Sequence, residues 1–265
     1  MGLRVIAERP YRLSVDNAPV YVQDFEVEST AGAIDAASVD EAFGETFARV
    51  WHGDAENDGF NRLVLAAGLH WRQVAMLRGY CKYLLQTGVP FSQAYVEGTF
   101  ARYPLLARLL VELFEARFDP ATGQESKDDI AAGQAQLKAH FDVLAAGDDA
   151  TLKVLKTVVD ARKGDRDAQM QAARDALLKL MDRVSSLDED RILRSFMGVI
   201  DATLRTSYYQ TDANGQHGHV ISFKFDSALV PDLPKPRPYR EIFVYGPRVE
   251  GTHLRFGAVA RGGLR

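Results

Sequence analysis

The chain has 265 residues, 46% of them hydrophobic, which suits one large or two modest globular domains with an apolar core. Its net charge of −4 argues against a nucleic-acid-binding protein, since such proteins usually carry a basic excess. The single cysteine favours a reducing cytoplasm. No apolar run reaches the roughly 18 to 20 residues that span a bilayer. We therefore expect a cytoplasmic protein without a nucleic-acid or membrane partner.

The first predicted elements are strands. Val and Tyr alternate with polar residues between Leu3 and Glu28, a pattern that favours strands over a helix. Residues 16–19 (DNAP) supply a turn between two of them. Two or three strands cannot bury both of their faces, so we expect residues 1–30 to be the end of a β module that begins upstream.

A helical pattern follows from about Ser38 to Ser207. Ser38 with Glu41, and Ser186 with Glu189, have the spacing of capping boxes that start helices. Residues 71–86 form one strong amphipathic helix, and Pro104 is placed to open another. The last helix is expected to include the apolar series Ile192, Leu193, Phe196, Val199, Ile200, Thr203 and Leu204.

Sparser apolar residues between about Lys127 and Arg183 predict helices that pack on one side only. Breaks are expected near Gly147 and Gly164, and an antiparallel helical arm fits this pattern.

Strand-like runs return after Ser207, beginning with Tyr208 and Tyr209. Residues 212–215 (DANG) signal a hairpin, and residues 231–238 form a proline-rich connection. The predicted fold class is therefore mostly α with flanking β segments (α+β), a helical bundle or arm between two incomplete sheet regions. We expect a β module over residues 1–30, a helical domain over 31–207 and a β-rich, truncated part over 208–265.

Several isolated residues invite functional interpretations. Cys81 lies on the apolar face of its helix and is expected in the core. His217 and His219 lack neighbouring ligands at metal-binding spacing, so no metal is expected. Trp51 and Trp71 are expected to be core aromatics rather than a stacking platform. No phosphate-binding or G-x-G-x-x-G loop is present in the sequence, so no nucleotide is expected for this chain.

The most specific signal lies at the end of the chain. Gly262 and Gly263 allow the backbone to turn tightly and to approach a ligand closely. Arg261 and Arg265 flank them with two permanent cations suited to a carboxylate or a phosphate. We therefore expect these four residues to form part of a substrate-binding loop.

Residues 241–265 (EIFVYGPRVEGTHLRFGAVARGGLR) closely resemble the start of the catalytic region in large NAD-specific glutamate dehydrogenases. Residues 60–100 and 188–210 resemble the same family, and residues 2–13 are similar to the closing strands of its ACT-like regulatory module. The resemblance implies that the chain is an internal fragment of such an enzyme.

The resemblance also implies residue roles. In smaller glutamate dehydrogenases the related loop reads Lys-Gly-Gly-Leu-Arg, and its lysine, which contacts the distal carboxylate of the substrate, corresponds to Arg261. Gly262, Gly263 and Arg265 match the rest of that loop. The catalytic lysine, the proton-transferring aspartate and the NAD-binding domain of the family are expected beyond residue 265, so this chain is expected to hold no catalytic, cofactor-binding or metal-binding residue.

In the parent enzyme, NAD would accept a hydride from L-glutamate, giving 2-oxoglutarate and ammonia, and a homo-oligomer is expected. The chain alone is expected neither to oxidise glutamate nor to bind NAD. Thermal stabilisation of the chain by NAD would contradict this expectation. Two alternatives stay open at this point. One is an independent helical interaction module, and the other is a regulatory domain that senses an acidic metabolite through Arg255, Arg261 and Arg265. Continuation of the reading frame into a nucleotide-binding fold would favour the enzyme.

Overall fold

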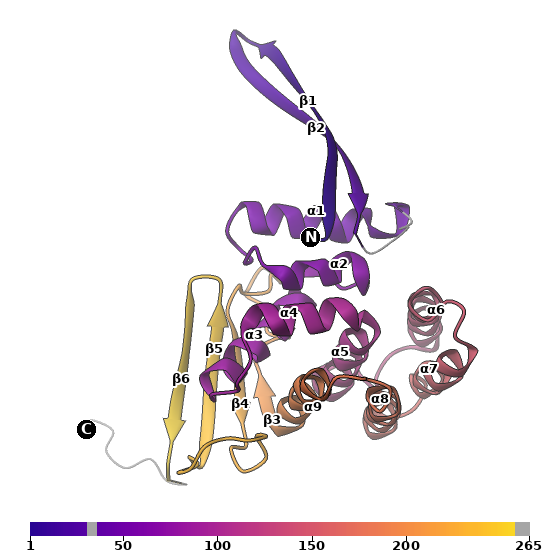
Figure 1. The fold of residues 1–265 in the computed structure, drawn as a ribbon, viewed down its shortest axis with the longest axis vertical. Coiled ribbons are helices and arrows are strands. Elements are labelled where there is room, and N and C mark those ends of the chain that lie inside the picture. Colours follow the sequence, from indigo (N-terminus) through magenta and orange to yellow (C-terminus); the bar gives the residue numbers. More distant parts are fainter. Residues whose placement is uncertain (31–35, 258–265) are drawn as a thin grey trace.

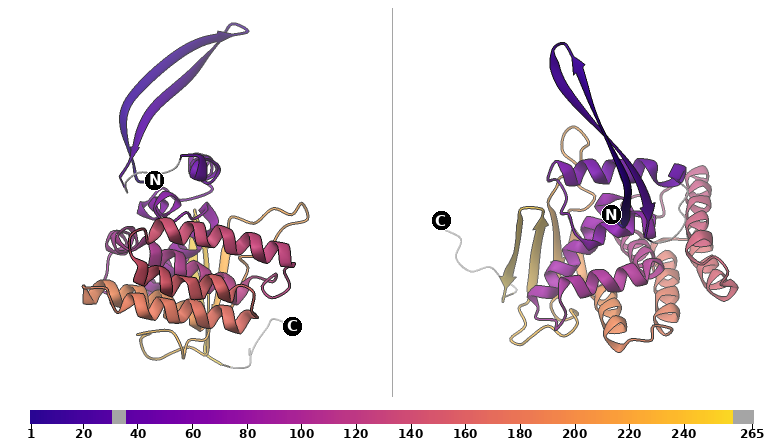
Figure 2. Two further views of the ribbon diagram at one scale, coloured as in Figure 1. Left: turned by 90° about the vertical axis from the view of Figure 1, so that its right-hand side faces the viewer. Right: turned by 45° about the horizontal axis from the view of Figure 1, so that its top comes forward.

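The computed structural model describes residues 1–30 and 36–257, and it confirms the α+β class (Figure 1). A β hairpin projects from a body in which a small sheet lies on one side and the helices on the other (Figures 1 and 2). The elements in chain order are β1 (Leu3–Val15), β2 (Ala18–Ser29), α1 (Ala36–Trp51), η1 (Gly59–Arg62), α2 (Leu63–Ala66), α3 (Trp71–Gln86), α4 (Gln93–Arg102), α5 (Pro104–Phe118), α6 (Lys127–Leu144), α7 (Asp149–Ala161), α8 (Arg166–Met181), α9 (Leu187–Ala202), β3 (Thr203–Thr206), β4 (Ile221–Phe225), β5 (Arg240–Gly246) and β6 (Val249–Arg255).

The hairpin of β1 and β2 is antiparallel and turns where the sequence predicts. Asp16 and Asn17 both adopt positive φ, at 50° and 65°, the geometry of a tight two-residue hairpin turn. Its distal half carries apolar cross-strand pairs, such as Leu13 opposite Val20, whose side chains are half exposed. The hairpin therefore makes little contact with the body, and the boundary expected at residue 30 stays a prediction.

Helix α3 has the predicted bounds and forms the centre of the core. His70 caps it by accepting from the Gln73 amide, and the Gln73 side chain accepts in return from the His70 amide. Cys81 is 1% exposed, which confirms the expected core cysteine. Helix α5 begins at Pro104, also as predicted, because a first-turn proline lacks only an amide that would have no partner inside the helix.

Three expectations about the other helices need correction. Ser38 is the third residue of α1, so the predicted capping box does not mark the start of that helix. Trp51, expected in the core, is 77% exposed at the end of α1. Ser186 does cap α9, whereas the Glu189 carboxylate binds Arg102 and the Tyr103 hydroxyl instead of the cap backbone.

The helices between Lys127 and Arg183 break at Gly147 and Gly164 as predicted, and they pack on the body through α8. Helix α8 packs along α5, and Arg166 at its start donates to the carbonyl oxygens of Ala116, Arg117 and Asp119 at the end of α5. These contacts satisfy carbonyl groups that have no partner inside α5. The region is thus a helical layer attached to the body (Figure 1).

The sheet has the order β3-β4-β5-β6, with antiparallel neighbours. Phe223 and Phe225 are buried on the face that α3 covers. Thr203 and Leu204, expected to end the last helix, instead belong to β3, because Thr203 pairs with Phe225. Tyr208 and Tyr209, expected in a strand, lie in a turn after β3. The boundary expected at residue 207 stays a prediction.

Among the described residues, no helix is long and apolar enough to cross a membrane.

Candidate functional site: a basic depression and a polar cleft

The four residues predicted to bind substrate, Arg261, Gly262, Gly263 and Arg265, lie outside the described residues. The structure places the strand that leads to them. β6 ends at Arg255, whose Nε donates to the Gly257 carbonyl oxygen across 3.0 Å. The sheet end around Arg255 is therefore the described strand end that precedes the predicted loop in sequence.

A basic depression of about 470 Å³ opens at this end of the sheet. Register places Arg205 opposite Lys224 and Arg240 opposite Arg255, so cations from four strands meet on the face turned away from α3. Arg240 forms an ion pair with Asp226 at 3.1 Å. The depression is lined by Leu204, Arg205, Lys224, Tyr239, Arg240 and Arg255. Its charge suits an anionic ligand.

A second concavity, which we name the polar cleft, lies where α1, the start of α3, the end of α5 and the loop after β3 meet. It has a volume of about 440 Å³. Its aromatic wall begins with Trp71, whose indole donates to Glu45 across 2.8 Å and lies 4.9 Å from the Arg49 guanidinium. The cleft is lined by Glu45, Arg49, His70, Trp71, Arg72, Glu115, Asp119, Tyr208, Tyr209, Gln216 and His217.

Arg72 fixes the loop that forms one side of the polar cleft. Its guanidinium donates to the carbonyl oxygens of Tyr208 and Gly218, and the guanidinium carbon, Cζ, lies 4.8 Å from the centre of the Tyr208 ring. Arg72 is 4% exposed, so these contacts compensate for removing its charge from water. The loop after β3 is thereby held against α3.

Several groups in the polar cleft have shifted pKa values, and two of them, Glu115 and His70, have shifts that bear on their charge near pH 7. Burial, reinforced by the nearby Glu112 carboxylate, raises the pKa of Glu115 to about 7, although Gln73 donates to it across 2.7 Å. Burial and the adjacent Arg108 and Arg72 lower the pKa of His70 to about 4. His70 is therefore neutral near pH 7 and can act as the helix cap described above.

The two histidines considered as metal ligands have other contacts. His217 Nδ1 lies 3.2 Å from the Gln210 carbonyl oxygen, and His219 Nδ1 lies 3.8 Å from Asp54. Over residues 1–30 and 36–257, no group of three His, Cys, Asp or Glu side chains is arranged to hold a metal ion.

Comparison with known proteins gives matches along most of the chain. Models of three glutamate dehydrogenase regions match it: the ACT3 domain at residues 1–40, helical motif 3 at 55–120, and the catalytic domain of bacterial NAD-glutamate dehydrogenase at 176–265. The whole chain is 41% identical to an NAD-specific glutamate dehydrogenase of Halomonas elongata. The chain belongs to the NAD-specific glutamate dehydrogenase family. Relatives from Pseudomonas aeruginosa and Mycobacterium tuberculosis, with the same name, are 40% and 39% identical over the whole chain.

The chain spans 14% of the length of these glutamate dehydrogenases. The region matched by the catalytic-domain model contains the basic depression, while the polar cleft takes Trp71 and Glu115 from the helical-motif region and Tyr208 from the catalytic region. The polar cleft thus lies at the junction of two family regions. Sequence reasoning missed it, because its residues are far apart in the chain and follow no local motif.

Proposed function

We propose that the full-length protein catalyses NAD-dependent oxidative deamination of L-glutamate to 2-oxoglutarate and ammonia. The observation that carries this proposal is the 41% identity over the whole chain to a protein named NAD-specific glutamate dehydrogenase, together with the match of residues 176–265 to the catalytic-domain model. Residues 55–120 would then belong to the helical region that links the regulatory and catalytic parts.

Within that enzyme, Arg261, Gly262, Gly263 and Arg265 would form the first wall of the glutamate site. Arg261 stands where smaller glutamate dehydrogenases carry the lysine that contacts the distal carboxylate, and a guanidinium offers a two-pronged contact to the same group. The basic depression at the adjoining sheet end supports this proposal, because its cations make the approach to the loop attractive to a dicarboxylate.

The test uses the full-length enzyme with Arg261→Ala and Arg261→Lys. We expect the alanine variant to raise KM for glutamate at least tenfold, the lysine variant to retain much of the affinity, and KM for NAD to change little. Arg248→Ala is the matched control, since Arg248 lies in the turn between β5 and β6. An unchanged glutamate KM in Arg261→Ala would remove Arg261 from the site, whereas no glutamate-dependent reduction of NAD by the wild-type enzyme would reject the activity itself.

We further propose a cytoplasmic homo-oligomer. The single cysteine, Cys81, is buried, so this segment has no need of an oxidising compartment. The long hairpin of β1 and β2 has two strands with free outer edges among the described residues, and such edges can pair with another copy. Cell fractionation and light scattering of the full-length protein would test the two statements separately.

A further inference from the structure

The sheet face turned away from α3 brings two pairs of like charges into direct register. Arg205 on β3 lies opposite Lys224 on β4, and Arg240 on β5 lies opposite Arg255 on β6. Like charges that face each other across neighbouring strands destabilise a sheet. The cations of the basic depression therefore repel one another, and an anion among them would relieve that repulsion.

The two pairs of cations form one group. Lys224 lies opposite Ile242 on β5, and Arg240 is two residues from Ile242 on the same strand. Residues two apart on a strand share a face, so Arg240 is the diagonal neighbour of Lys224. Long side chains in diagonal positions can reach each other. The cations thus make a continuous line across the sheet from β3 to β6.

Two of these cations have no carboxylate to compensate them. Within the described part of the chain, the side chains of Arg205 and Lys224 form no hydrogen bond or ion pair. Arg240 does have a partner, because its Nη1 lies 3.1 Å from the Asp226 carboxylate. The charges of Arg205 and Lys224 are therefore available to a ligand.

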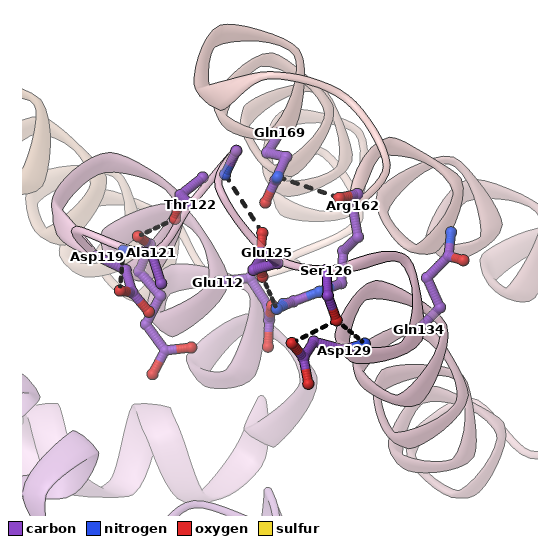
Figure 3. Close-up of polar contacts among 12 residues, drawn as sticks. Glu112, Asp119, Ala121, Thr122, Glu125, Ser126, Asp129, Gln134, Arg162 and Gln169 are labelled. Carbon is purple, nitrogen blue, oxygen red and sulfur yellow. Dashed lines mark hydrogen bonds and ion pairs between the residues drawn. The ribbon is translucent and has the colours of Figure 1, made fainter.

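Cations in the helical layer have a different role. Arg162, the residue after α7, lies 3.3 Å from the Glu112 carboxylate and 3.5 Å from that of Glu125 (Figure 3). Arg166 binds the last carbonyl oxygens of α5. These arginines join helices to one another, whereas no contact between described elements accounts for the side chains of Arg205 and Lys224.

An aromatic ring forms one wall of the basic depression. The Arg240 guanidinium carbon lies 4.1 Å from the centre of the Tyr239 ring, and Arg240 also donates to the Tyr239 carbonyl oxygen across 2.6 Å. These contacts hold the tyrosine in place. Its ring is 44% exposed, so part of it is open to a flat group bound in the depression.

The spread of the cations indicates the length of the ligand. Neighbouring strands lie about 4.8 Å apart, so stems on four strands extend over roughly 14 Å. One carboxylate or one phosphate group contacts only adjacent cations in such a line. A chain of phosphoryl groups carries several negative charges along its length, and the depression, at about 470 Å³, has the volume of a small-molecule site.

We propose that the basic depression binds a diphosphate or triphosphate group, as a ligand distinct from glutamate, through Arg205, Lys224 and Arg240. Guanidinium groups match phosphoryl oxygens with two parallel hydrogen bonds, and the lysine ammonium adds a third cation. Such a group occurs in inorganic polyphosphate and in nucleotides, and the base of a nucleotide would stack on Tyr239. The proposal does not depend on the proposed dehydrogenase activity.

Calorimetric titration of the 265-residue chain at pH 8, low ionic strength and without magnesium tests the proposal. The ligands are tripolyphosphate and ATP, with glutamate as a competitor. We expect saturable binding of tripolyphosphate with a Kd below about 1 mM, which added salt weakens and glutamate does not displace. Tighter binding of ATP assigns the site to a nucleotide, and equal or weaker binding assigns it to the phosphate chain alone.

Variants locate the binding. Arg205→Gln and Lys224→Gln each remove a cation without a described partner, so neither leaves a carboxylate unpaired, and circular dichroism checks that both fold. Each is expected to weaken tripolyphosphate binding at least about fivefold. Without ligand, each should raise the midpoint of thermal unfolding, because one like-charge pair is removed. Lys153→Gln, at an exposed position on α7, is the matched control.

Several results overturn the proposal. They are no saturable binding of tripolyphosphate, wild-type affinity in both Arg205→Gln and Lys224→Gln, or an equal loss of affinity in Lys153→Gln. A lower unfolding midpoint in both depression variants would show that these cations already have partners, which removes the basis of the proposal.

Two further measurements separate the depression from other sites. Unchanged tripolyphosphate binding in Arg261→Ala supports the proposal, whereas lost binding would place the ligand on the predicted substrate loop. Binding by the full-length enzyme also supports it. If the 265-residue chain binds and the full-length enzyme does not, an acidic segment of the parent polypeptide covers this sheet face and the free-ligand proposal is wrong.

Discussion

The Tyr83 hydroxyl donates a hydrogen bond of 2.6 Å to the Glu241 carboxylate, joining the molecule's central helix, α3, to the start of β5. Tyr83 is 1% exposed and Glu241 is 3% exposed. Burial and the adjacent carboxylate both raise the pKa of Tyr83, so its hydroxyl is protonated near pH 7 and can donate this hydrogen bond. This contact fixes the position of β5 against α3, next to strand β6.

Tyr83→Phe is expected to destabilise the protein by about 2 kcal/mol, because the buried Glu241 carboxylate loses its hydrogen-bond donor. Urea unfolding followed by circular dichroism measures the effect. Tyr239→Phe is the matched control and should change stability by less than about 0.5 kcal/mol, since Tyr239 is 44% exposed. Equal losses in the two variants would show that the hydrogen bond contributes nothing specific.

Two helical glycines are expected to respond oppositely to alanine. A Cβ at Gly79 would lie 2.9 Å from the Phe223 ring, so Gly79→Ala should cost about 1 to 3 kcal/mol by forcing α3 away from the sheet. A Cβ at Gly98 in α4 would meet no described atom of another element within 4 Å, and Gly98→Ala should stabilise by up to about 1 kcal/mol through helix propensity. Thermal unfolding of the pair tests the prediction, which fails if both changes have the same sign.

Glu115 is expected to make stability depend on pH. Its pKa in the folded protein is raised from 4.5 to about 7, mainly by burial, so the folded state keeps a proton that the unfolded chain releases. The contribution of Glu115 is therefore most favourable below pH 4.5 and is lost as the pH rises to about 7. Glu115→Gln should remove this loss, raising stability relative to the wild type by on the order of 2 kcal/mol at pH 8 and by little at pH 4.5.

Urea unfolding of wild type and Glu115→Gln at several pH values measures that difference. Asp142→Asn serves as the control, because it also replaces a helical carboxylate by an amide, here at a half-exposed position. A constant difference between Glu115→Gln and wild type across this range would mean that Glu115 titrates normally.

Cys81 is expected to be unreactive in the folded protein. Burial, reinforced by the carboxylates of Glu97 and Asp58, raises the pKa of its thiol to about 12, and the thiolate is the reactive form. Treatment with a thiol reagent should label the chain in urea but not in buffer at pH 8. Labelling of the native chain at the rate of a free thiol would contradict the packing of α3.

Local sequence patterns predicted helix bounds correctly where apolar spacing or a helix-terminal residue determined them. The bounds of α3 and the start of α5 at Pro104 follow from apolar periodicity and from terminal residues that act within a single turn. The turn at Asp16 and Asn17 follows in the same way from residues that tolerate positive φ. These features depend on neighbours in sequence, which is why they could be predicted.

The incorrect predictions concern residues whose environment depends on segments far away in the chain. Thr203 continues the periodicity of α9, yet it joins β3 because Phe225, a residue of β4, offers a strand partner. Trp51 is a large apolar residue of the kind common in cores, but it is the last residue of α1 and is 77% exposed. Neither outcome could be predicted from the residues of one helix alone.

The sequence by itself determined the family and the order of strands and helices, because each is carried by ordered local motifs, and it also predicts the residues of a substrate loop. Only the tertiary structure decided that Glu115 and Tyr209 would line one cleft and that Arg205, Lys224 and Arg240 would meet at one end of the sheet. The physical reason is that such sites form when α5 and the loop after β3, or three separate strands, pack together. Burial and charge at these sites are properties of that packing, and no single segment possesses them.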